Sequence, residues 1–150
     1  MAEWSDVLDA VTTALSGDRE RGRGLLLDCW DRTSPSDHAH RCVLAHYLAD
    51  LEPELGDEIR WDETALAEHA YLMEEPGGEE SLAAVGIPAA GAMAPSLHLN
   101  LADGYLRRGD IPAAREQLAL GQATVGRLGD DGYGALVRSG LDRLAARISP

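Results

Sequence analysis

The chain has 150 residues, of which 45% are hydrophobic and 26% charged, and this is the composition of one ordinary globular domain. Its formal net charge of −13 is opposite to the basic field that binders of nucleic acids and anionic membranes need, so both partner classes are excluded. The acidity favours a basic protein or peptide as partner. The alternative is that the charge serves only solubility.

Four amphipathic helices are predicted in the N-terminal half of the chain. Apolar residues recur every three or four positions from Trp4 to Leu15, through Leu25 to Trp30, from Ser36-Asp37 to Leu51 and from about Asp57 to Glu75. The first segment is thus an amphipathic helix and not a charged-then-apolar export signal. No apolar run approaches the ~18–20 residues of a membrane span. We therefore expect a cytoplasmic protein that does not enter a membrane.

Residues 76–94 interrupt this pattern with several glycines and prolines, and they are predicted to form a linker with at most one short helical turn around Ser81–Val85. A connection of this length is unusual in a compact helical array. Two interpretations remain open. The segment is either a mobile linker, or its apolar residues dock on the helices and shield part of a groove; these residues are Leu82, Val85, Ile87 and Met93.

Helical periodicity returns after Pro95. One helix carries Leu97, Leu101 and Tyr105 on a single face, and the next begins at Asp110, whose side chain is suited to cap it. A last helix over residues 131–148 is predicted to bury one apolar face, formed by Tyr133, Leu136, Val137, Leu141 and Leu144.

The dipeptide Gly-Asp stands between the two helices of each predicted pair, as Gly17-Asp18, Gly56-Asp57 and Gly109-Asp110. Glycine tolerates the left-handed conformation that ends a helix, and aspartate caps the following one. The same turn chemistry at three places predicts three antiparallel helix hairpins.

The segment from Pro95 to Val125 resembles a tetratricopeptide repeat, a helix pair with a period of about 34 residues. The matching positions are Ala102, Tyr105, Gly109-Asp110, Ala114, Leu118 and Gly121. The resemblance implies an all-α fold in which one domain spans residues 1–150. It would contain repeat-like units at 3–35, 37–75 and 95–128, the linker 76–94 and a capping helix at 131–148, stacked as a right-handed superhelix.

Proteins of this family commonly hold a peptide or a partner helix in a concave groove, lined by the first helix of each pair. The resemblance places Asn100 where the family often bonds the ligand backbone, with Asp103 and Arg107 on the same face. Corresponding positions of the second unit are Cys42, His46 and Asp50. The expected function is a protein- or peptide-binding adaptor. The alternative is that these side chains form an ordinary solvated surface.

A second class of function centres on His46: a small-molecule- or metal-binding regulatory protein, or an enzyme. His38, Cys42 and His46 lie in a row at spacings of four residues, and His69 or His98 would have to complete a metal site. No phosphate loop, nucleophile motif or dense Cys/His cluster is present in the sequence. We therefore expect a protein that is not an enzyme and holds no cofactor, with Cys29 and Cys42 reduced and buried.

Overall fold

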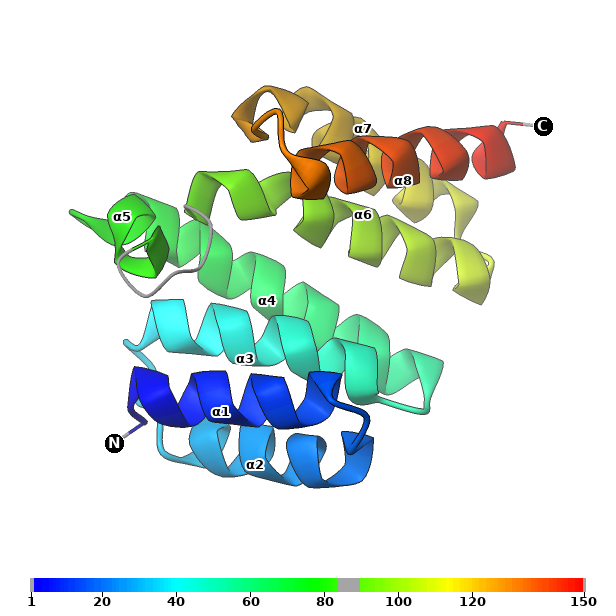
Figure 1. Cartoon of the computed structure of the whole chain (residues 1–150). Helices are drawn as coiled ribbons and strands as arrows, with labels where there is room; N and C mark the ends of the chain where they lie inside the picture. The colour runs from blue at the N-terminus through cyan, green and yellow to red at the C-terminus, as the bar shows by residue number, and fades with distance from the viewer. Residues whose placement is uncertain (1, 84–89, 150) are drawn as a thin grey trace.

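The computed structural model describes residues 2–83 and 90–149, and within these ranges every regular element is a helix. The elements are α1 (Trp4–Leu15), α2 (Arg19–Asp31), α3 (His38–Leu51), α4 (Leu55–Glu74), α5 (Gly78–Ala83), α6 (Ala90–Arg108), α7 (Ile111–Ala123), a 3-10 turn (Val125–Arg127) and α8 (Gly132–Ile148) (Figure 1). The all-α prediction is confirmed for this part of the chain. None of its helices is both long and apolar enough to cross a bilayer.

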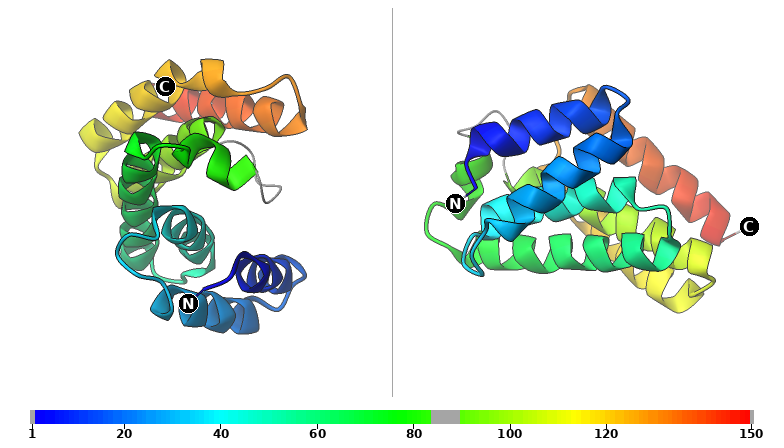
Figure 2. Two further views of the ribbon diagram at one scale, coloured as in Figure 1. Left: turned by 90° about the vertical axis from the view of Figure 1, so that its left-hand side faces the viewer. Right: turned by 90° about the horizontal axis from the view of Figure 1, so that it is seen from below.

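The helices follow a C-shaped curve, seen end-on in the left panel of Figure 2. Helices α1 and α2 form one arm of the curve, and α7 and α8 form the other. Most helices pack against their neighbours in chain order, while α4 packs directly on α6. The short helix α5 contacts α3, α4 and α6, so it lies at the centre of the curve.

Two of the three predicted Gly-Asp turns are present. Gly17 and Gly109 have φ values of +105° and +88°, in the left-handed region that glycine favours. The side chain of Asp18 accepts a hydrogen bond from the amide of Arg21, and Asp110 caps α7 in the same way.

The prediction of a turn at Gly56-Asp57 is wrong, because both residues lie inside the first turn of α4. The chain reverses instead at Glu52, Pro53 and Glu54. Proline disfavours helical geometry in the residue before it, and Glu52 accordingly has extended backbone angles. Proline chemistry, and not glycine chemistry, therefore makes the second hairpin.

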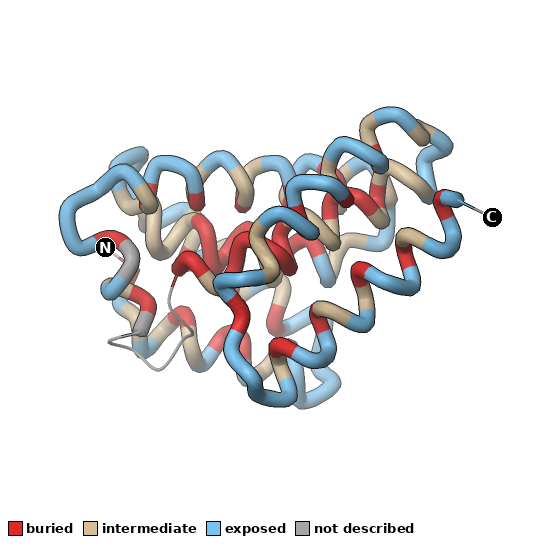
Figure 3. Tube along the Cα trace, turned by 90° about the horizontal axis from the view of Figure 1, so that it is seen from above, coloured by how far each residue is buried: buried red, intermediate tan, exposed pale blue. Residues whose placement is uncertain are grey.

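Buried residues gather along the faces where the helices meet (Figure 3). They form two clusters, one around Leu26, Leu44 and Leu48 and the other around Leu118 and Leu141. The predicted apolar faces are mostly buried, but Leu15 and Leu136 are 73% and 66% exposed. Each is the stripe residue that no neighbouring helix covers.

The linker predicted at 76–94 is largely helical in its described residues. Helix α6 begins at Ala90, so Pro95 lies inside it and not before it. Proline within a helix costs about 3 kcal/mol. Burial of apolar side chains offsets this, since Leu82 and Met93 are 0% and 6% exposed and belong to the N-terminal cluster. The docked interpretation therefore holds for these two; Val85 and Ile87 lie outside the described residues.

Candidate functional site

An ion network joins α4, α6 and α8. The carboxylate of Asp103 accepts hydrogen bonds from Arg107 Nε at 2.8 Å and from Arg147 Nη1 at 2.9 Å. Arg107 also pairs with Glu58 on α4. Asp103 and Arg107, expected on one face of a helix, are thus paired, and α4 and α8 contribute to the same network.

Asp62 lies on α4 beside this network, one helical turn after Glu58. It is 3% exposed and makes no side-chain hydrogen bond or ion pair within the described residues, although its oxygens are not fully enclosed; among the described residues, only an atom of His46 is both fully enclosed and unpartnered. Burial, together with the nearby carboxylates of Asp50 and Glu58, raises the pKa of Asp62 to about 8. At neutral pH this carboxyl is therefore mostly protonated, although an incoming positive charge would favour its ionised form.

His46 and Asp50 lie one helical turn apart on α3, and Asp50 is close enough to Asp62 to affect its pKa. The Nδ1 atom of His46 is buried and has no hydrogen-bond partner in the described part of the chain. Burial lowers the pKa of His46, and desolvation raises that of Asp50, while their mutual attraction opposes both shifts. The Asp50 carboxylate also raises the pKa of Asp62, so α3 and α4 present their acidic groups to one place. We call His46, Asp50, Glu58, Asp62, Asp103 and Arg107 the inner polar cluster.

Asn100 lies two turns before Arg107 on α6. Together with Asp103 it lines a hollow of about 300 Å³ between α6 and α8, whose other walls include Arg143 and Arg147. Gly140 on α8 packs closely against Leu99 on α6, since a Cβ there would lie 2.7 Å from a methyl carbon of Leu99, whose side chain would have to shift. Asn100 is thus positioned beside the inner polar cluster.

Cys42 does not belong to the surface of this cluster. The residue is 0% exposed, and burial raises the pKa of its thiol to about 12. The expectation that Cys42 contacts a partner is therefore wrong, because its place on α3 faces the core. Both Cys29 and Cys42 are free and buried, as expected.

The alternative metal site is not assembled in the described residues. His38 Nδ1 donates to Glu68 at 2.6 Å, His69 Nε2 donates to the carbonyl of Ala90 at 2.7 Å, and His98 is hydrogen-bonded to Gln117. Within the part of the chain that the structure describes, no group of three or more His, Cys, Asp or Glu residues can hold a metal ion.

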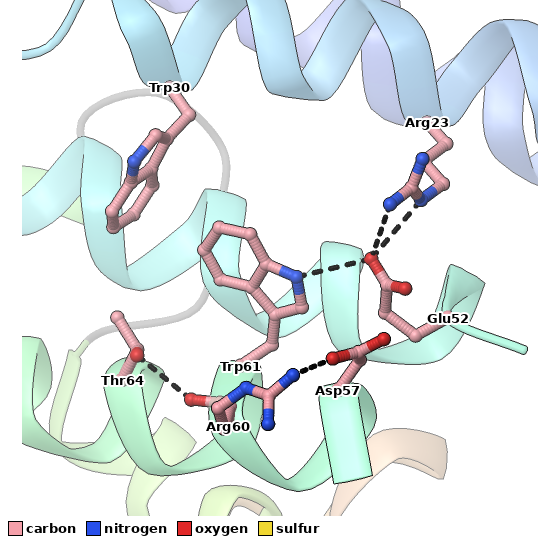
Figure 4. Close-up of a pocket in the computed structure, with 7 residues that line it drawn as sticks. All are labelled: Arg23, Trp30, Glu52, Asp57, Arg60, Trp61 and Thr64. Atoms are coloured by element: carbon pink, nitrogen blue, oxygen red, sulfur yellow. Dashed lines mark hydrogen bonds and ion pairs between the residues drawn. The ribbon is translucent and has the colours of Figure 1, made fainter. Parts of the chain in front are cut away.

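A second hollow, of about 470 Å³, was not predicted from sequence. Its lining residues are Arg23, Trp30, Glu52, Asp57, Arg60, Trp61 and Thr64 (Figure 4). Trp30 and Trp61 meet edge to face, with ring centroids 5.0 Å apart and planes at 80°. We call this hollow, between α2, α4 and the turn that joins α3 to α4, the tryptophan pocket.

Glu52 holds one side of the tryptophan pocket together. One of its carboxylate oxygens accepts hydrogen bonds from Trp61 Nε1 at 3.2 Å and from Arg23 Nε and Nη2 at 3.1 and 2.9 Å. The Glu52 side chain is 4% exposed, whereas that of Arg23 is 41% exposed. Trp30 is held by a further contact, because the guanidinium of Arg41 stacks over its ring at 4.7 Å from the centroid.

Sequence reasoning overlooked Asp62 and both tryptophans. Asp62 had a detectable signal, because it interrupts the buried stripe of α4 three residues after Ile59 and three before Ala65. A carboxylate in such a position is rarely buried without a reason. The pairing of Trp30 with Trp61 had no local signal, since it depends on how α2 and α4 are placed in space.

Comparisons of the chain with protein-family models, with curated proteins and with solved structures find no match. The resemblance to tetratricopeptide repeats therefore rests on the residue pattern around Gly109-Asp110.

Proposed function

We propose that the protein is an adaptor of the tetratricopeptide-like kind, which holds an extended segment of a partner protein in the groove beside the inner polar cluster. The stacked helix pairs and the placement of Asn100, Asp103 and Arg107 on α6 support this proposal. The partner segment lies along α6, where Asn100 hydrogen-bonds its backbone.

The observation that carries the proposal is the buried carboxyl of Asp62, which has no partner among the described residues. A buried carboxyl that lies among other carboxylates, with its pKa raised by them, is a candidate for a functional site. Arg107 makes no hydrogen bond to Asp62 because its guanidinium bonds Glu58 and Asp103, and its charge only partly opposes the rise in the pKa of Asp62. A lysine or arginine side chain of the partner would supply the missing charge.

This assignment predicts the chemistry of the partner. A cationic side chain placed between Asp50 and Asp62 would ionise Asp62, and the proton would be released on binding. Since the pKa of Asp62 is raised to about 8, affinity for a basic segment rises as the pH increases from 6 toward 8. The net charge of −13 also speeds the encounter with a basic partner.

Fluorescence polarisation with labelled peptide pools tests the proposal. Each pool contains random octapeptides with a fixed central residue: arginine, lysine, glutamine or glutamate. We expect the arginine and lysine pools to bind most tightly and the glutamate pool to bind least. Asn100→Ala weakens binding of every pool, whereas Asp62→Asn weakens only the basic pools and removes the pH dependence.

Asp31→Asn is the matched control, because it removes one negative charge from an exposed position of α2 far along the chain from the groove. If Asp31→Asn reduces binding as much as Asp62→Asn does, the attraction is due to overall charge, and the groove assignment is wrong. Equal binding of the basic and acidic pools would also contradict the proposal.

A further inference from the structure

The tryptophan pocket lies outside the inner polar cluster, and no role has been assigned to it. Its volume of about 470 Å³ is within the range of ligand sites, which runs from roughly 300 to 1,000 Å³. Figure 4 shows the indole of Trp61 between Trp30 on one side and Glu52 on the other. Aromatic rings thus form one wall, and charged side chains form the opposite one.

The charged side chains of the pocket differ in how accessible they are to a ligand. The side chain of Glu52 is 4% exposed, and its Oε1 atom already accepts three hydrogen bonds, so this oxygen is not open to a ligand. Asp57 is paired with Arg60. The arginines are more accessible, since the side chains of Arg23 and Arg60 are 41% and 73% exposed.

Each of these arginines retains N–H groups for a ligand. Arg23 uses Nε and Nη2 on Glu52, and Arg60 uses Nη2 on Asp57; the described residues supply no acceptor to the other guanidinium nitrogens. A guanidinium presents its donors as a planar fork that fits a carboxylate. The pocket therefore offers guanidinium donors, while one oxygen of each of its two carboxylates is already hydrogen-bonded.

We propose that the tryptophan pocket binds a carboxylate attached to an aromatic ring, with the ring against Trp30 and Trp61 and the carboxylate on Arg23 and Arg60. This chemistry has two sources: a free aromatic acid, or the C-terminus of a polypeptide that ends in an aromatic residue. The inference does not depend on the groove, because the two sites share no residue.

Tryptophan fluorescence reports directly on this pocket. The chain has three tryptophans, so Trp4→Phe leaves only Trp30 and Trp61 as indoles. In this background we would titrate N-acetyl-phenylalanine, which resembles a chain terminus, phenylacetate, which represents a free aromatic acid, and N-acetyl-phenylalaninamide, which has no carboxylate. We expect saturable changes with both acids and at least a roughly tenfold weaker response to the amide.

Arg60→Gln removes one guanidinium from the pocket. Because the Arg60 side chain is 73% exposed, we expect the variant to fold, and a thermal melt checks this. Arg21→Gln is the control, because Arg21 is exposed on α2, does not line the pocket and changes the net charge equally. We expect Arg60→Gln to weaken acid binding about tenfold and Arg21→Gln to leave it unchanged.

Tighter binding of N-acetyl-phenylalanine than of phenylacetate supports the polypeptide terminus as the source, and the reverse order supports a free acid. The proposal is overturned if the amide binds as tightly as the acids, or if Arg21→Gln and Arg60→Gln have the same effect. It is also overturned if neither acid produces a saturable change by about 10 mM.

Discussion

Two carboxyl groups are almost equally buried in this protein but differ in what surrounds them. The side chain of Glu52 is 4% exposed and accepts hydrogen bonds from Trp61 and twice from Arg23. Asp62 is 3% exposed and has no such donor among the described residues. Glu52 links α2, α4 and the turn between α3 and α4 through its hydrogen bonds. The desolvation of Asp62, by contrast, is not offset by a side-chain hydrogen bond in the described residues.

The difference shows that burial alone does not define a structural carboxylate. Neighbouring helices supply the donors to Glu52, while around Asp62 they supply more carboxylates, from Asp50 and Glu58. A buried group whose surroundings disfavour its charge is a candidate for function. Substitution of each carboxyl tests whether this difference in surroundings affects stability.

The largest effect is expected at Asp62. Its pKa is about 8 in the folded chain and roughly 3.9 in an unfolded one, so the folded state holds the proton more tightly. Stability contributed by this group is therefore fully present below about pH 4 and is lost as the pH rises toward 8. The loss is on the order of 5 kcal/mol, from a difference of about 4 pKa units at about 1.36 kcal/mol each, and Asp62→Asn removes it.

Urea unfolding of wild type and Asp62→Asn at several pH values between 4 and 9 measures this effect. The advantage of the variant over wild type should grow steadily with pH and level off above about 8. Parallel stability profiles for the two proteins would show that Asp62 has a partner in solution, and the contrast with Glu52 would disappear.

The next largest effect is expected at Glu52. Glu52→Ala removes the acceptor of three hydrogen bonds and leaves the indole N–H of Trp61 without one. We expect a loss of roughly 2–3 kcal/mol in the free energy of unfolding, together with a change in Trp61 fluorescence. Glu54→Ala is the matched control, since that side chain is exposed and does not cap α4. Equal losses in the two variants would mean that the hydrogen bonds contribute nothing specific.

The smallest effect is expected in the ion network beside Asp62. Arg147 pairs with Asp103, but its side chain is 53% exposed, so solvent screens the attraction. Arg147→Gln should cost less than about 1 kcal/mol, and salt should reduce even this. A larger loss that persists at high salt would indicate that the network fixes α8 on α6.

Local chemistry made the helices predictable. The stripes in α1, α3 and α8 follow from the 3.6-residue period, and Asp18 and Asp110 cap their helices because the capping bond spans only three residues. The same reasoning placed the second turn wrongly at Gly56, where the proline two residues after Leu51 decides the reversal. It also predicted a linker where Leu82 and Met93 are part of the core.

The candidate sites were only partly predictable. The row of Asn100, Asp103 and Arg107 is set by their spacing on one helix, so its common face could be deduced, and α3 likewise directs His46 and Asp50. Cys42 was assigned to the groove because helical spacing says which residues share a face, but not how wide the exposed part of that face is.

By itself, then, the sequence determined the all-helical architecture, two of the hairpin turns and the acidic character of the surface. Only the tertiary structure decided that Asp62 is buried without a donor, that Glu52 receives three, and that Trp30 meets Trp61. The physical reason is the distance along the chain over which each interaction acts. Helix propensity, capping and side-chain direction act within about four residues along the chain, whereas desolvation, ion pairing and ring packing depend on which helices meet and at what register.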